Sequence, residues 1–339
     1  MNLTACLHEF FDQYLPHIKG VRQNTLDTYR HTFSLFLPFA ARSRRIDVRM
    51  LTLEDLSPEL ILAFLNHLEA QRKNTSTTRN NRLAALKSFA RMVRLLYPEG
   101  QIYADKILSI PKKRTRKPLI GYLFPDEILR VFNSVDLGKN EGFRDYTILH
   151  LLSDSGARAT EVATLNLDYF DPQNKTLAIL GKGNRFRQIE LAEKTVELIK
   201  LYIDKYRPKP KPQFHNRLFV NQQAKELTRH GINRICRKYL HQALPEKRVK
   251  GLNPAHSFRH SCAINMLCSG KDVTEIKNRL GHEKLETTMV YLKLDMSRKR
   301  QIQKEFIQYT QSSITTDSKI NDLIDWENKE KTLAWLDSI

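Results

Sequence analysis

The sequence predicts a mainly α-helical protein with one small β-hairpin, an α+β fold in two domains. Apolar residues recur at helical spacing through most of the chain, while residues 176–191 alternate around a glycine-rich turn. A basic stretch bounded by prolines, residues 109–118, interrupts the helical pattern. A length of 339 residues with 41% hydrophobic residues suits two packed cores. We therefore expect a helical domain over 1–108, a linker over 109–118, a second domain over 119–310 and a tail over 311–339.

Four helices are predicted in the first domain, and residue types mark where three of them begin. Apolar stripes indicate helices over residues 3–15, from about 24 to 41, from 57 through 68, and from 76 to about 96. Asn24-Thr25 is predicted to cap the second helix. Ser57-Pro58 begins the third, because proline suits the first helical position, and Ser76 begins the fourth.

The fourth helix has a second, polar face that carries Arg79, Arg82 and Lys87 among threonines and asparagines. Such donors suit phosphate contacts and base edges in a DNA major groove. A solvated basic face is the alternative interpretation. A net charge of +19 and a pI near 9.8 favour a polyanionic partner, and therefore nucleic acid.

Charge and composition also limit the setting in which the protein works. Five of the ten residues over 109–118 are basic, which suits a strand along a DNA backbone, with a plain solvated linker as the alternative. They are Lys112, Lys113, Arg114, Arg116 and Lys117. No stretch of about 18 apolar residues could span a bilayer, and the N-terminus lacks the layout of a secretory signal. Four scattered cysteines fit a reducing cytoplasm without disulfides or a zinc site.

The second domain is predicted to begin with helices over 125–133 and 143–155. Gly156 then ends a helix, and a new helix begins near Thr160. Arg158 therefore lies on a tight connector, where its guanidinium can be aimed at a phosphate. Glu161 is placed to orient it.

A hairpin follows, with strands over 176–180 and 185–191 around Gly181-Lys182-Gly183-Asn184. Flanking glycines let Lys182 project from the tip, and the spacing is not that of a phosphate-binding P-loop. We expect next a helix over 192–206, a short strand over 218–220 and a helix over 228–244. The last carries basic residues that suit phosphate contacts or solubility, namely Arg229, Arg234, Arg237 and Lys238.

A third group of polar residues lies between Asn253 and Leu292. A helix beginning near Ser257 would bring His256, Arg259 and His260 together, because positions three and four apart share a face. Gly281 ends a short helix over 273–280 and places His282 at its mouth. Tyr291 follows nine positions later. A tyrosine near histidines and an arginine suggests phosphoryl transfer, because a phenol is a poor nucleophile without cations and a base.

The motif His-x-x-Arg-His, then Leu-Gly-His, then Tyr291 resembles the catalytic signature of the tyrosine recombinases, which include phage integrases, Xer-type resolvases and transposon integrases. The stretches around Arg158 and Lys182 resemble the family's first arginine box and its hairpin lysine, and the first domain is similar to its core-binding domain. The resemblance implies a clamp on double-stranded DNA and cleavage through a 3′-phosphotyrosine.

The resemblance also implies a role for each matching residue. Tyr291 would be the nucleophile, and Lys182 would protonate the leaving 5′-oxygen. Arg158, Arg259 and His282 would stabilise the phosphate. His256 would assist proton removal or bind a phosphate oxygen, and His260 would be an orienting residue. No metal ligand set is apparent at His256, His260 and His282, and no cofactor is needed.

Family analogy predicts four protomers on two DNA sites, and it leaves open whether a second recombinase takes part. The tail over 311–339 carries six acidic against three basic residues and several apolar ones, so it is expected to dock on a neighbouring subunit or on its own second domain. A type IB topoisomerase and a catalytically silent DNA-binding regulator are the alternative functions. The choice among integration, excision and transposition, and between cleavage in cis and in trans, stays open.

Overall fold

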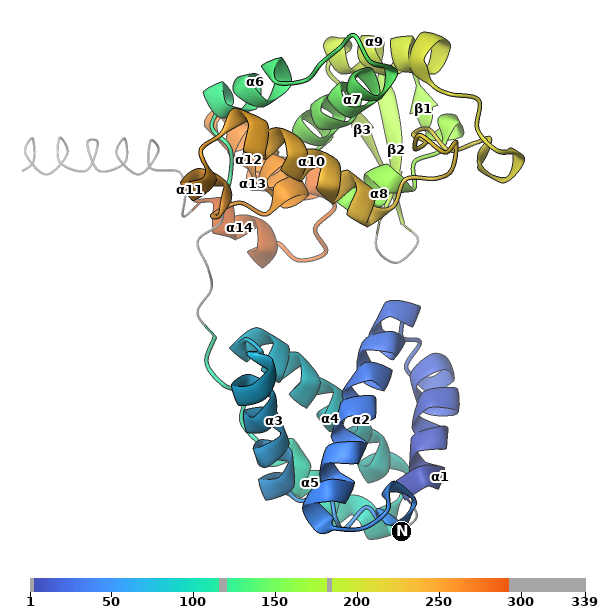
Figure 1. Cartoon of the computed structure of the whole chain (residues 1–339), viewed down its shortest axis with the longest axis vertical. Helices are drawn as coiled ribbons and strands as arrows, with labels where there is room; N and C mark the ends of the chain where they lie inside the picture. Colours follow the sequence, from blue (N-terminus) through green and yellow to red (C-terminus); the bar gives the residue numbers. More distant parts are fainter. Residues whose placement is uncertain (1–2, 116–120, 182–184, 293–339) are drawn as a thin grey trace, which may run out of the picture. The chain divides into compact units, whose positions relative to one another are not determined.

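The chain folds into two compact units, Met1–Pro118 and Leu119–Ile339, each with its own hydrophobic core (Figure 1). The computed structural model describes residues 3–115, 121–181 and 185–292. Helices dominate both units, and the second also contains one small antiparallel sheet. The predicted fold class, mainly helical with a small sheet, is confirmed. No helix within the described ranges is long and apolar enough to cross a membrane.

The first unit packs its helices around α4, which contacts α2, α3 and α5. The helices are α1 (Leu3–His8), which continues as a π-helix (Glu9–Ile18), α2 (Gln23–Arg44), α3 (Pro58–Arg72), α4 (Ser76–Leu96) and α5 (Gln101–Ser109), with 3-10 turns at Val48–Met50 and Pro98–Gly100. Phe10, Phe33 and Phe89 meet in its core, with ring centroids 5.4–5.9 Å apart. Such aromatic pairs add about 1 kcal/mol each to the burial of their surface.

Helix starts in this unit follow the capping residues in part. Ser57 accepts a hydrogen bond from the amide of Leu60, as a proline-led start predicts. The predicted cap at Asn24-Thr25 is wrong, because the amides of Thr25 and Leu26 already donate to the carbonyl of Arg22, so α2 begins at Gln23. Helix α5 was not predicted; it buries Ala104 and Ile107 against α4.

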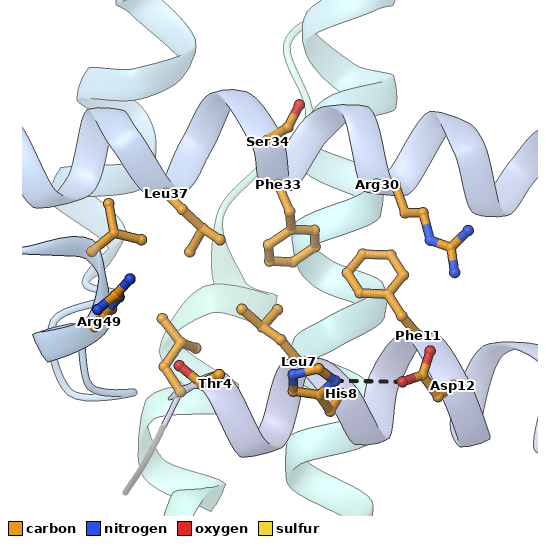
Figure 2. A pocket seen from close by; sticks show the side chains of 12 residues that line it. Thr4, Leu7, His8, Phe11, Asp12, Arg30, Phe33, Ser34, Leu37 and Arg49 are labelled. Atoms are coloured by element: carbon orange, nitrogen blue, oxygen red, sulfur yellow. Dashed lines mark hydrogen bonds and ion pairs between the residues drawn. The ribbon is translucent and has the colours of Figure 1, made fainter.

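An apolar groove lies within the first unit between the α1 and π-helix segment and α2 (Figure 2). Leu7, Phe11, Phe33 and Leu37 line it, and its volume is about 530 Å³. The labelled polar groups lie around these apolar side chains, including the exposed pair of His8 with Asp12 at 3.5 Å.

In the second unit, α12 packs against α7, α10, α13 and α14; Figure 1 labels these helices. Its helices are α6 (Pro125–Asn133), α7 (Asn140–Ser155), α8 (Ala159–Ala163), α9 (Glu193–Leu201) with a π-helix (Tyr202–Tyr206), α10 (Arg229–Ala243), α11 (Glu246–Val249), α12 (Pro254–Cys268), α13 (Val273–Leu280) and α14 (Glu286–Leu292), with 3-10 turns at Leu167–Tyr169 and Pro212–Phe214. The ends of these helices, rather than their middles, carry most of the predicted site.

The sheet has the order β1-β2-β3, with both pairs antiparallel. Its strands are β1 (Phe170–Asp171), β2 (Thr176–Leu180) and β3 (Phe186–Glu190). Leu177 pairs with Ile189, and both are buried, so one face of the hairpin joins the core. The predicted hairpin is confirmed by the pairing of β2 with β3.

Two predictions about this unit are wrong. The helix expected to begin near Ser257 begins at Pro254, with Asn253 as an extended N-cap, because proline fits the first turn. The strand expected over 218–220 does not form. In this part of the described chain there are only two isolated β-bridges, Asn166 with Arg217 and Val220 with Glu226. The apolar run is buried, and burial alone does not distinguish a strand from other buried segments.

Candidate active site

Arg158 lies where the chain turns sharply between α7 and α8. Gly156 ends α7 with a φ of +61°, and a Cβ there would lie 2.5 Å from a methyl of Leu280. Glycine therefore serves both the left-handed conformation and the close approach. Arg158 becomes the N-cap of α8. Its amide donates to Glu161 Oε2 (2.8 Å), and its Nη1 donates to Glu161 Oε1 (2.7 Å). The Arg158 side chain stays 33% exposed, so it can reach a ligand.

Arg187 of β3 completes this group, and sequence reasoning missed it. Its Nη2 and Nη1 donate to the two carboxylate oxygens of Glu161 at 2.7 and 3.2 Å. Burial alone would raise the pKa of Glu161, but the hydrogen bonds and charge of Arg187, together with Arg158, lower it. A signal was present: Arg187 is two positions from the buried Ile189, so it shares the inward face of its strand. A basic residue on that face needs a buried partner.

Arg259 of α12 is almost fully buried and joins two chain segments. Its Nη1 donates to the carbonyl of Gly156 (2.6 Å), and its Nη2 donates to the carbonyl of Leu280 (2.7 Å). Burial, with the charge of Arg158 adding to it, lowers the pKa of Arg259 to about 10. The guanidinium remains charged near neutral pH and has further N–H donors beyond these two bonds.

Tyr291 of α14 is buried, with 3% of its surface exposed. Its hydroxyl lies 2.9 Å from Nδ1 of His260, one turn along α12 from His256. Burial raises the pKa of Tyr291 to about 12, against the opposing charges of Arg259 and Arg158. Burial, followed by the nearby His256 and Arg259, lowers the pKa of His260 to about 4. The phenol is therefore protonated at neutral pH and bonded to a neutral imidazole.

His282 follows the glycine that ends α13, and the residue is buried, with 9% of its surface exposed. Its Nδ1 lies 2.8 Å from Oγ1 of Thr288, one turn before Tyr291 on α14. Burial and the charges of Arg259 and Arg158 lower the pKa of His282 to about 4. The predicted placement of His282 at the mouth of a short helix agrees with the helix bounds.

A cavity of about 230 Å³ lies beside Arg158 and His256. Its remaining lining residues come from the start of α8, from α10 and from the start of α12 with its N-cap, namely Ala159, Thr160, Arg229, Asn233, Asn253 and Ala255. Arg229 and Asn233 were not predicted as neighbours of Arg158, because a spacing of about 70 residues carries no information on contact. The cavity is cationic and of a size that suits a phosphate group.

Other predicted site residues have varied environments. Lys182, Arg116 and Lys117 lie outside the described residues. Lys112, Arg114, Arg234 and Arg237 are exposed. Lys113 is exposed as well, but its Nζ lies 3.0 Å from Glu69, and its backbone exchanges two hydrogen bonds with Asn80.

The prediction of an open basic face on α4 is wrong for Arg79, which is 6% exposed and paired with Glu69 at 3.4 Å. Arg82 is half-buried, and Lys87 donates to the carbonyl of Leu108 (2.6 Å). Helix α5 and the chain after it cover this face, and neither could be placed by the helical periodicity of α4. No group of three or more metal-binding side chains gathers within the described ranges.

A helical unit joined to a second unit that gathers arginines, histidines and a buried tyrosine defines a class, the DNA recombinases of the tyrosine type. The phage integrase family model matches residues 122–298, and the model of the phage integrase N-terminal SAM-like domain matches residues 9–94. The chain belongs to the phage integrase family and is a tyrosine-type site-specific recombinase.

Individual relatives support the same family membership. The chain is 30% identical over 305 residues to the putative integrase/recombinase y4rC of Sinorhizobium fredii, covering 88% of this chain and 90% of that protein. It is 28% identical to tyrosine recombinase XerD of Staphylococcus epidermidis, covering 88% and 99%. Among solved structures, XerH recombinase bound to a palindromic difH substrate gives a TM-score of 0.65 at 19% identity, covering 88% of this chain and 87% of that one. At this low sequence identity, the similarity to XerH shows a shared fold only.

Proposed function

We propose that the chain recombines DNA at specific sites by cleaving and rejoining strands through a 3′-phosphotyrosyl bond at Tyr291, in integration, excision or transposition. The observation that carries this is the hydrogen bond between the buried Tyr291 hydroxyl and His260, 2.9 Å long. The same unit holds Arg158 and Arg259 near this pair, and the positive charges of both arginines act to lower the pKa of Tyr291. We place the reaction in the cytoplasm, on double-stranded DNA.

In the proposed reaction the Tyr291 oxygen attacks the scissile phosphorus, and the bond to the 5′-oxygen breaks. His260 accepts the phenol proton, because it is the imidazole that contacts the hydroxyl. Arg158 and Arg259 offer cationic donors to the non-bridging oxygens, with His282 assisting. His256 lines the cavity beside Arg158 and would bind a phosphate oxygen. Lys182 would protonate the leaving oxygen. The phosphotyrosyl ester keeps the bond energy for rejoining, so no ATP is consumed.

The role of His260 as proton acceptor predicts an unusual pH profile. Because the pKa of His260 is lowered to about 4, its accepting, neutral form is present at any pH above that value. We expect the single-turnover rate of adduct formation at saturating DNA to change less than about twofold between pH 7.5 and 5.5. An acceptor with the ordinary pKa near 6.5 would lose roughly tenfold in rate between pH 7.5 and 5.5. That steeper fall would contradict the assignment, and His260→Ala should be slower by about 10² or more.

DNA binding is proposed to use the exposed basic residues of the linker and of α10. Each phosphate neutralised contributes roughly 0.9 to the slope of log affinity against log salt. Substituting Lys112 and Arg114 together by glutamine should therefore lower that slope by about 1.8, as measured by fluorescence anisotropy on a duplex. Lys113→Gln is the matched control, because Glu69 already pairs with that charge. A slope that does not change in the double variant would remove the linker from the interface.

The test of the proposed function is a nicked suicide duplex that carries the element's end sequence, analysed on a denaturing gel. A covalent protein–DNA band at a preferred site supports site-specific recombination. Bands on any sequence, with relaxation of supercoiled DNA, would favour a type IB topoisomerase. Tight binding without a band would favour a regulator.

We also propose a four-protomer complex in which the tail over 311–339 docks on a neighbouring subunit. A native gel of the protein with its DNA should show that complex, and deleting the tail should abolish it.

A further inference from the structure

We propose that Arg187 is a positioning residue that fixes Arg158 and the end of α13 in the arrangement that DNA cleavage requires. This inference rests on the proposed function and deepens it. Neither the motif spacing nor the family match assigns a role to Arg187. The assignment comes from the contacts of its guanidinium, which joins three elements of the second unit.

The first of these contacts is the buried carboxylate of Glu161, which Arg187 shares with Arg158. Glu161 Oε1 accepts from both arginines, and Oε2 accepts from Arg187 and from the Arg158 amide. The side chains of Glu161 and Arg187 are 6% and 12% exposed, so this charge pair is shielded from water. Arg187 therefore neutralises Glu161 and leaves Arg158, which is 33% exposed, with charge to offer a phosphate.

The second contact is the C-terminal turn of α13. Nε of Arg187 donates to the carbonyl of Arg279 (2.9 Å), and the next carbonyl, that of Leu280, accepts from Arg259. Gly281 follows with a φ of +64°, and a Cβ there would lie 2.9 Å from Nη1 of Arg187. The left-handed conformation therefore favours glycine here, and a side chain at this position would crowd the Arg187 guanidinium. His282 is the residue directly after this turn, so Arg187 also helps to fix the position of the His282 backbone and thus of its ring.

The third element is β3 itself, one strand of the hairpin whose loop contains Lys182. One guanidinium therefore connects the hairpin, the Arg158 turn and the His282 turn, which are distant in sequence. Without Arg187, Glu161 would keep Arg158 as its partner among these residues and would compete with the phosphate for it. A misplacement of about 1 Å at such a group slows reactions by roughly 10²-fold.

The experiment compares Arg187→Gln with a matched control, Arg248→Gln. Arg248 of α11 also forms a bidentate pair with a carboxylate, Glu127, and donates to the carbonyl of Tyr122. Among the residues that the structure describes, it bonds to none that is proposed to act in catalysis. At saturating DNA, Arg187→Gln should form the adduct about 10²-fold more slowly than wild type. Arg248→Gln should stay within about threefold.

A substrate with a neutral methylphosphonate at the scissile position separates positioning from general damage. This group carries one negative charge less and so depends less on Arg158. The deficit of Arg187→Gln should therefore shrink to within about fivefold on this substrate. An equal deficit on both substrates would overturn the proposal.

Hydrogen exchange without DNA tests the same linkage independently of activity. Amides over residues 157–162 and 280–282 should exchange faster in Arg187→Gln than in the wild type. In Arg248→Gln their exchange rates should equal those of the wild type. Unchanged exchange in both segments of Arg187→Gln would overturn the inference, even if the wild type forms the adduct. Faster exchange in a protein that forms no adduct would leave the linkage standing and reject the proposed function instead.

Discussion

Replacing Tyr291 by phenylalanine is expected to abolish the covalent protein–DNA adduct while duplex affinity stays within about twofold. The substitution removes one oxygen, the proposed nucleophile, and nucleophile removal lowers rates by about 10⁴-fold or more. Tyr291 is 3% exposed and packs with Ile264, Leu267 and Leu280, so phenylalanine keeps that packing. Losing the hydrogen bond to His260 should cost about 1 kcal/mol of unfolding free energy. The suicide duplex and a urea titration measure the two effects.

Tyr239→Phe is the matched control for this prediction. Tyr239 is also buried in the second unit, and its hydroxyl donates to Asp145 at 3.2 Å. Its replacement should lower stability to a similar extent and leave adduct formation unchanged. An adduct that persists in Tyr291→Phe would assign the nucleophile to another side chain, and the proposed mechanism would fall with it.

Replacing Arg259 by methionine is expected to lower both cleavage and stability. Loss of a cationic donor to the phosphate should slow adduct formation by about 10³-fold. The carbonyls of Gly156 and Leu280 would also lose their partner inside the protein. A buried group left without its hydrogen bond costs about 1–3 kcal/mol, so we expect the unfolding free energy to fall by about 3 kcal/mol.

Arg158→Met separates the two effects of Arg259. Arg158 is a third exposed, and Glu161 would keep its pair with Arg187, so stability should fall by less than about 1 kcal/mol. Its cleavage rate should nevertheless fall by a factor similar to that of Arg259→Met. Equal losses of stability in the two variants, measured by urea unfolding, would contradict the assignment of a structural role to Arg259 alone.

Local signals predicted much of the fold. Proline and serine at the start of α3, glycine at the end of α13 and the alternation of β2 and β3 act within a few residues, so their effect appears in the sequence. The predictions were wrong where packing between neighbouring elements decides the structure. Helix α5 depends on packing against α4, and Arg79 appeared to belong to an open basic face because its partner Glu69 lies on another helix.

The order and spacing of Arg158, Arg259, His282 and Tyr291 can be read from the sequence, and they were sufficient to indicate the family. Only the tertiary structure decided which groups meet: His260 with the Tyr291 hydroxyl, 31 positions apart, and Arg187 with Glu161 and the carbonyl of Arg279. The physical reason is that spacing along one helix or strand fixes the direction of a side chain locally. Contacts between elements, and the burial that shifts the pKa values of His260 and Tyr291, depend on how α12, α13, α14 and β3 pack together.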